Sequence, residues 1–207
     1  FGIFGDGKEV AQLAMAKVFM AGDWRSGYYR DQTFMLAAGM LTMPEFFAQL
    51  YANTDPDADP GSGGRQMNCH FASRLLNEDG SWMDLTSTKN SSSDISPTGG
   101  QMGRLVGLAL ASKLYKNNPD LNYLKNFSVN GNEVAFGTIG NASTSEGIFF
   151  EAINAAGVLQ VPMAISIWDD AYGISVPAEY QTTKQDISEI LKGFQRDDKG
   201  EGYEIFK

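Results

Sequence analysis

Two oxygen-bearing side chains, Asn141 and Asp170, stand 29 positions apart in the sequence. Asn141 closely follows the apolar segment EVAFGTI at positions 133–139, and Asp170 closely follows PMAISIW at positions 162–168. Amide and carboxylate oxygens are hard ligands of the kind that Mg²⁺ prefers, and Mg²⁺ usually completes its octahedron with phosphate oxygens and water. If the two segments are neighbouring strands, the pair predicts a shared site for magnesium and a diphosphate.

The elements around this pair predict a strand–helix–strand unit. Positions 133–139 and 162–168 have the pattern of buried strands, and positions 145–160 have that of an amphipathic helix. Such a unit forms a right-handed crossover between parallel strands. Ligands of parallel sheets collect at the carboxyl ends of the strands, where residues 140–143 and 168–172 both fall.

The turn before the predicted helix indicates an anion site. Ser143 and Glu146 have the spacing of a capping box, which places the helix N-terminus just after Asn141 and Ala142. Free backbone N–H groups and the positive end of the helix dipole then face the space above the turn. Many such turns cap their own helix and bind nothing, so it is the second strand end that favours a ligand.

The composition bounds the class of protein. The 207 residues are 43% hydrophobic, as in an ordinary soluble globular protein, and a net charge of −9 argues against nucleic acid as the main partner. The single cysteine, Cys69, excludes an internal disulfide framework and favours a reducing, cytoplasmic compartment. We expect no membrane span and no signal peptide. Because the sequence begins at Phe1 without methionine, we expect part of a longer polypeptide.

Residues 1–207 are predicted to form one diphosphate-binding domain with three regions. Residues 1–53 are mainly helical, residues 54–98 are loops of a length that is unusual unless they bind something, and residues 99–207 form the α/β core with the metal motif. Thr42 and Glu45 in the first region have capping-box spacing.

A resemblance to a known family supports this interpretation. The segment GNASTSEGIFFEAINAAGVLQVPMAISIWDDAYGISVP, from Gly140 to Pro177, resembles the thiamine-diphosphate motif of the alpha subunits of 2-oxoacid dehydrogenases, the decarboxylating first component of the pyruvate and branched-chain complexes. That motif begins with Gly-Asp-Gly, passes through Ser-x-Gly and a helix, and ends in Asn-Asn followed by Ile-Ser-x-Pro. The resemblance implies an α/β fold of three layers, with a parallel sheet flanked by helices, and the cofactors thiamine diphosphate and Mg²⁺.

The metal residues depart from the family pattern in a compensated way. Asn141 stands where the family has aspartate, and Asp170 stands where the family has its second asparagine. One carboxylate and one amide oxygen remain, so we expect both to bind Mg²⁺, and the resemblance makes the backbone carbonyl of Tyr172 the third protein ligand. The alternative is a degenerate relative without metal. The resemblance also assigns cofactor contacts to four turn residues: Gly140, Asn141, Ala142 and Ser143.

A literal Gly-Asp-Gly at Gly5, Asp6 and Gly7 is not this motif. Only four residues precede it, too few for a core strand, and the residue 29 positions after Asp6 is Met35, which is no magnesium ligand. We expect a turn there.

Earlier segments resemble the same family. In SGYYRDQ, the resemblance makes Tyr29 and Arg30 diphosphate contacts, and the planar fork of arginine suits two phosphate oxygens. In GGRQMNCHFAS it makes His70 an active-site histidine, with Asn68 in place of the family's proline. In DISPTGGQ it places Ser96 and the backbone of Thr98 beside the cofactor's aminopyrimidine ring.

The resemblance implies oxidative decarboxylation of pyruvate or a branched-chain 2-oxo acid, with acyl transfer to a lipoyl acyltransferase partner. In the family, a beta-type half supplies the glutamate that activates the cofactor. No segment here resembles that half, so we expect a hetero-oligomer or a dimer of fused chains, and no turnover by this chain alone.

Two other functions remain open. One is a transketolase-like carbon–carbon ligase, and the other is a noncatalytic relative that acts as a scaffold. A nicotinamide-binding Rossmann domain is disfavoured, because the turn lacks G-x-G-x-x-G.

Overall fold

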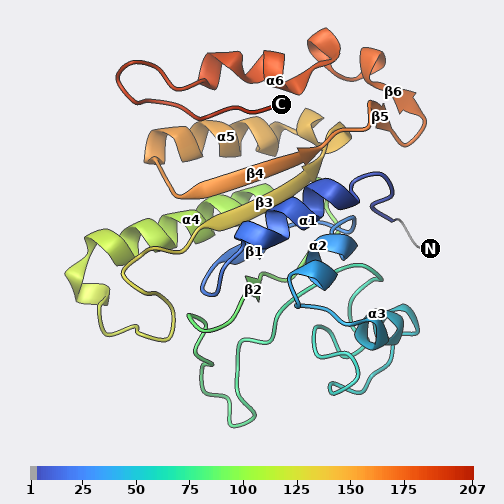
Figure 1. Cartoon of the computed structure of the whole chain (residues 1–207), viewed down its shortest axis with the longest axis vertical. Coiled ribbons are helices and arrows are strands. Elements are labelled where there is room, and N and C mark those ends of the chain that lie inside the picture. Colours follow the sequence, from blue (N-terminus) through green and yellow to red (C-terminus); the bar gives the residue numbers. More distant parts are fainter. Residues whose placement is uncertain (1–3) are drawn as a thin grey trace.

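A four-stranded parallel sheet organises the chain in the computed structural model, which describes residues 4–207 (Figure 1). The strand order is β2-β1-β3-β4. The strands are β1 Trp24–Ser26, β2 Asn90–Ser91, β3 Ala135–Gly140 and β4 Met163–Trp168. The register of β3 and β4 runs from Ala135 beside Met163 to Gly140 beside Trp168, so the two longest strands end together. The predicted parallel strand–helix–strand unit is confirmed.

Helices cover both faces of this sheet. The helices are α1 Glu9–Val18, α2 Gln32–Ala37, α3 Met43–Leu50, α4 Gln101–Asn117, α5 Gly147–Leu159 and α6 Ile187–Ile190. Buried residues of α4 and α5 pack together on one face of β3, and those of α1 and α2 pack on the other. A short hairpin, β5 Tyr172–Gly173 and β6 Val176–Pro177, follows β4. The predicted three-layer α/β fold is therefore confirmed.

The alternation of side chains along β3 separates two apolar cores. Ala135 and Ile139 pack into the cluster formed with α4, α5 and α6, and Phe136 packs into the cluster formed with α1 and α2. Gly137 lies between Ala135 and Ile139 on β3, and a β-carbon there would overlap the side chain of Leu105 on α4. The glycine therefore allows α4 to approach the sheet closely.

The two capping boxes predicted from the sequence have different outcomes. The box at Thr42 and Glu45 is confirmed, since each residue's side chain bonds to the backbone N–H of the other. The box at Ser143 is wrong: Ala142–Ser145 is a short 3₁₀ turn, and α5 begins at Gly147 with Glu146 as an N-cap that makes no side-chain bond. The chain needs this extra turn to pass from the end of β3 to the axis of α5.

Two smaller predictions concern the segment at Gly5–Gly7 and the absence of a membrane span. Asp6 and Gly7 lie in a turn, as expected for the rejected Gly-Asp-Gly. None of the helices within residues 4–207 combines the length and apolar character needed to cross a bilayer.

Candidate active site

The ends of β3 and β4 bring the two predicted metal ligands to one edge of the sheet. Asn141 directly follows β3, and its backbone N–H donates to the carbonyl of Trp168 at 3.2 Å. Asp170 is two residues beyond Trp168, the last residue of β4. Asn141 is only 5% exposed, and its side chain has no hydrogen-bond partner among the described residues. Its amide oxygen is therefore available to a ligand.

The carboxylate of Asp170 already has a cationic partner. Its Oδ2 accepts from Lys8 Nζ at 2.9 Å, and its Oδ1 accepts from the backbone N–H of Tyr172 at 3.2 Å. Partial burial alone would raise the pKa of Asp170, but the hydrogen bonds from Lys8 and Tyr172 and the charges of Lys8 and Arg30 lower it below its ordinary value. A metal ion at this carboxylate would compete with the ammonium group of Lys8.

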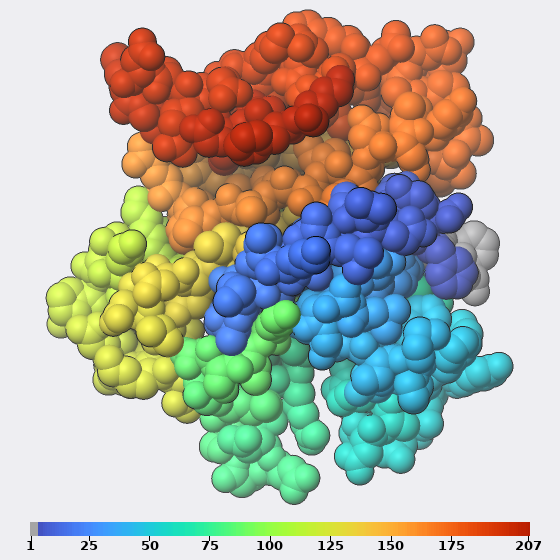
Figure 2. Space-filling model, viewed as in Figure 1, coloured from blue at the N-terminus to red at the C-terminus, as the bar shows by residue number. Residues whose placement is uncertain are grey.

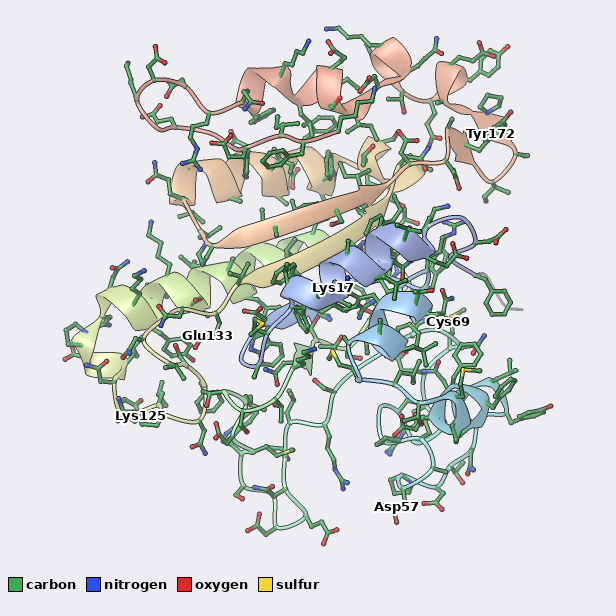
Figure 3. All side chains as sticks on the ribbon, viewed as in Figure 1. Lys17, Asp57, Cys69, Lys125, Glu133 and Tyr172 are labelled. Atoms are coloured by element: carbon green, nitrogen blue, oxygen red, sulfur yellow. The ribbon has the colours of Figure 1, made fainter. Side chains whose placement is uncertain are left out.

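The hairpin that carries Tyr172 lies against the turn that carries Asn141. Gln181 Nε2 donates to the carbonyl of Ala142 at 3.0 Å, and a β-carbon on Gly173 would lie 2.9 Å from that of Ala142. Figure 3 places Tyr172 on this hairpin, beyond the end of β4. The three predicted ligand positions therefore come from adjacent backbone segments, and the donor set of one carboxylate, one amide and one carbonyl fits Mg²⁺.

No larger acidic cluster competes with this donor set. Within residues 4–207, no group of three or more His, Cys, Asp or Glu side chains could hold a metal ion. A metal here would need the amide and carbonyl oxygens beside the single carboxylate.

The turn at Gly140 also receives Arg30. A β-carbon on Gly140 would lie 3.4 Å from Tyr28 Oη and 3.8 Å from Arg30 Nη1, so these groups border the backbone where the diphosphate is predicted. Arg30 stacks on the ring of Tyr29, with Cζ 5.2 Å from the ring centroid, and has no ion pair within the described chain. Its guanidinium is held in place but not neutralised, as an anion site requires.

Tyr28 is a site residue that the sequence did not indicate. Its Oη is buried and has no hydrogen-bond partner among the described residues. Burial and the charge of Asp31 raise its pKa above the ordinary value, against the lowering effect of Arg30. The phenol therefore stays neutral and can donate a hydrogen bond beside the turn where a phosphate would sit. The adjacent Tyr29 carried the family motif, so the sequence offered no separate signal.

His70 and Ser96, which the sequence assigned to the site separately, lie side by side. His70 Nε2 lies 3.2 Å from Ser96 Oγ, and His70 Nδ1 lies 3.2 Å from the backbone carbonyl of Asn68. A carbonyl can only accept, so in the neutral ring Nδ1 carries the proton and Nε2 is an acceptor. The Ser96 hydroxyl lies within donating distance of this nitrogen and of the Met67 sulfur, which is 3.3 Å away. Thr98 is exposed on the loop two residues further on.

A buried ion cluster, which we call the Arg25 cluster, joins these segments. It consists of Arg25, Asp31 and Asp94: Arg25 Nε donates to Asp31 at 2.8 Å, and its Nη1 and Nη2 each donate to one oxygen of Asp94 at 3.0 Å. Burial alone would lower the pKa of Arg25, but Asp94 and Asp31 raise it above its ordinary value, so the guanidinium stays charged.

The Arg25 cluster connects the parts of the site through the chain. Asp31 follows Arg30 directly, and Asp94 lies two residues before Ser96. The backbone N–H of Phe71, next to His70, donates to Asp94 at 2.9 Å. Strand residues Thr138 and Trp168 donate to Asp31 through their hydroxyl and indole groups. The sequence prediction did not include Arg25.

These groups define a class of protein: an α/β protein that presents an arginine, a histidine and oxygen ligands at the carboxyl edge of a parallel sheet, where phosphorylated cofactors bind. Comparison with known proteins gives the particular family. The model of the Dehydrogenase E1 component family matches residues 1–195. The chain belongs to this family.

Individual relatives agree with the family model. The chain is 32% identical over 196 residues to the 2-oxoisovalerate dehydrogenase subunit alpha of Bacillus subtilis, covering 94% of this chain and 50% of that protein. It is 26% identical over 187 residues to the pyruvate dehydrogenase E1 component subunit alpha of Acholeplasma laidlawii, covering 88% of this chain and 41% of that protein. The chain thus spans half or less of the length of these relatives.

Proposed function

We propose that this chain is the alpha-type half of a thiamine-diphosphate-dependent 2-oxoacid dehydrogenase. The observation that carries the proposal is the pairing of β3 with β4, which sets Asn141 and Asp170 at one sheet edge with the Tyr172 hairpin packed beside them. The names of the relatives, 2-oxoisovalerate and pyruvate dehydrogenase alpha subunits, support the same reaction class.

Each group at the site has a role in this proposal. Asn141, Asp170 and the carbonyl of Tyr172 hold Mg²⁺, and the backbone from Gly140 to Ser143 receives the diphosphate. The backbone N–H groups of Ala142 and Ser143 have no partner among the described residues, so they are free to donate to phosphate oxygens. Arg30 and Tyr29 bind the diphosphate from the other side.

Bound thiamine diphosphate supplies the electron sink that makes loss of CO₂ from a 2-oxo acid possible. The protein's part is to orient this group and move protons near it. Ser96 and the backbone of Thr98 border the aminopyrimidine ring. His70 offers Nε2 as a proton acceptor and, once it carries that proton, as the donor to the 2-oxo acid.

The substrate and partners follow from the same proposal. The substrate is pyruvate or a branched-chain 2-oxo acid, and the acyl group passes to a lipoyl acyltransferase. A beta-type subunit or domain completes the site, so the assembly is a hetero-oligomer or a dimer of fused chains in the cytoplasm.

Calorimetric titration with thiamine diphosphate, with and without Mg²⁺, tests the cofactor site. Asn141→Ala should remove the magnesium-dependent part of the affinity, and Arg30→Ala should weaken binding whether or not Mg²⁺ is present. The double variant Asn141→Asp/Asp170→Asn restores the family's order and should bind no more weakly than the unchanged chain, since the ligand set is the same. Weaker binding by that double variant would mean that the exchange is not compensated.

One observation favours a second function, a noncatalytic scaffold. Lys8 already neutralises Asp170, as a site without metal would require. Absence of magnesium-dependent cofactor binding, even with a beta-type partner present, would establish this alternative.

Turnover tests the divided active site. Pyruvate and branched 2-oxo acids should be decarboxylated only when a beta-type partner is added, and activity without that partner would overturn the divided site. The same assay with a ketose donor separates this enzyme from a transketolase-like ligase.

A further inference from the structure

A cavity of about 420 Å³ lies outside the proposed cofactor site. It is bounded by α2, the start of α3 and the loops around residues 59–61, 71–74 and 83–89. Figure 2 shows a notch between the green and cyan lobes that these segments form. None of the residues predicted to bind cofactor or metal lines this cavity. Its volume is in the range of small-molecule sites.

The floor of the cavity is apolar. Met35 and Phe71 are almost fully buried at its base, and Met40, Leu41 and Met83 also line it. Methionine side chains adapt their shape to irregular ligands, so this floor suits a flexible aliphatic chain better than a rigid ring of fixed shape.

The charged groups around the cavity differ in what they are free to bind. Of the two acids, Glu45 accepts from Thr42 in its capping box, and Asp59 accepts from neighbouring groups of its own loop. Of the two bases, Lys89 makes one hydrogen bond, to the carbonyl of Ala38 at 3.2 Å, and Arg74 has no partner within the described chain. The two acids already accept hydrogen bonds, whereas the two bases keep N–H donors that bond to no described residue and are free for a ligand. These free cationic groups stand out in a chain whose net charge is −9.

We propose that this cavity binds a small aliphatic monocarboxylate. Its tail lies on the methionine-lined floor, and its carboxylate bridges Arg74 and Lys89. A guanidinium binds a carboxylate through two parallel hydrogen bonds, and the ammonium of Lys89 has donors to spare after its bond to Ala38.

Titration of the purified protein with octanoate, in the absence of thiamine diphosphate, tests the proposal. Octanoate should bind saturably at one site per chain, and octanol, which has the same tail without the charge, should bind about tenfold more weakly. Arg74→Gln should weaken octanoate binding by about tenfold, since it removes a charge-assisted contact. Arg74 is exposed, so this substitution leaves the fold intact.

Lys125→Gln is the matched control. It makes the same change in net charge on the loop between α4 and β3 (Figure 3), and octanoate affinity should not change. Equal binding of octanol and octanoate, equal binding by Arg74→Gln and the unchanged chain, or displacement of octanoate by thiamine diphosphate with Mg²⁺ would each overturn the proposal. The affinities of octanoate and octanol are measured without cofactor, so these results are independent of the proposed function.

Discussion

At the scale of single residues, Arg25 should matter more to stability than any surface ion. Arg25→Leu would leave Asp31 and Asp94 buried without a cation, and removal of one partner from a buried pair costs about 3–5 kcal/mol of the free energy of unfolding. Arg196→Leu is the control: Arg196 pairs with Glu204 at 3.1 Å, but these side chains are 50% and 56% exposed, and such a pair contributes at most about 1 kcal/mol. Urea denaturation compares the two variants, and similar losses would contradict a stabilising role for the Arg25 cluster.

Lys8 should act as a competitor of the metal ion. Lys8→Met removes the ammonium group that competes with Mg²⁺ for Asp170, and we expect Mg²⁺ to bind about fivefold more tightly, which corresponds to about 1 kcal/mol, the Coulomb energy of two unit charges about 4 Å apart in water. Lys17→Met on α1 changes the net charge equally but removes no bond to Asp170, so its Mg²⁺ affinity should stay as it was. Titration of Mg²⁺ at saturating thiamine diphosphate measures both, and an unchanged affinity in Lys8→Met would show that the ion pair does not oppose the metal.

These residues differ in how far the sequence could predict them. Asn141 and Asp170 follow long apolar strands, so the parallel arrangement alone places them at one edge. Arg25 lies in a polar, aromatic stretch, where a charged residue is ordinarily exposed. Its partners are 6 and 69 positions away, and only the folded chain shows that they surround it. The same limit hid Tyr28, which is buried in the apolar cluster formed with α1 and α2.

At the scale of elements, the two capping boxes provide a direct comparison. Thr42→Ala should lower the free energy of unfolding by about 1 kcal/mol, because Thr42 accepts from the backbone N–H of Glu45 at the start of α3. Ser143→Ala should change it by less than about 0.5 kcal/mol, because Ser143 makes no cap bond in its 3₁₀ turn. Thermal or urea unfolding of both variants checks this, and a loss of about 1 kcal/mol in Ser143→Ala would mean that the residue caps α5 after all.

Element length explains which parts of the fold were predictable. β3 and β4 have six residues each, and α4 and α5 have 17 and 13, which is long enough for their periodicity to show. β1 has three residues and β2 has two, so neither carries a pattern of its own. Their places come from pairing: β1 lies beside β3, which is more than 100 positions away in the chain.

At the scale of the whole molecule, the Arg25 cluster and the two apolar cores couple the site to global stability. Asp31 receives bonds from β3 and β4 and lies at the start of α2, and Asp94 holds the segment of His70. The elements at the strand ends are therefore connected, through Asp31 and Asp94, to segments far apart in the sequence. Cofactor binding should be visible as stabilisation of the complete fold and not only of one loop.

Thiamine diphosphate with Mg²⁺ should therefore raise the free energy of unfolding, by about 2.7 kcal/mol at a concentration 100 times Kd. The magnesium-dependent part should also depend on pH. Because Lys8, Tyr172 and Arg30 lower the pKa of Asp170 in the folded chain, its carboxylate stays charged at and above its ordinary pKa of about 4, and it is protonated only as the pH falls through the lowered value.

The extra stabilisation by Mg²⁺ should then be constant from about pH 8 to about pH 5 and should disappear only under more acidic conditions. Thermal unfolding with Mg²⁺ or with a chelator, repeated across this range, measures it. In Asp170→Asn the side chain at position 170 cannot be protonated in this range. Any magnesium-dependent stabilisation that remains in this variant should therefore persist at the acidic pH where the unchanged chain loses it. If the variant and the unchanged chain lose their stabilisation at the same pH, a group other than Asp170 controls metal binding.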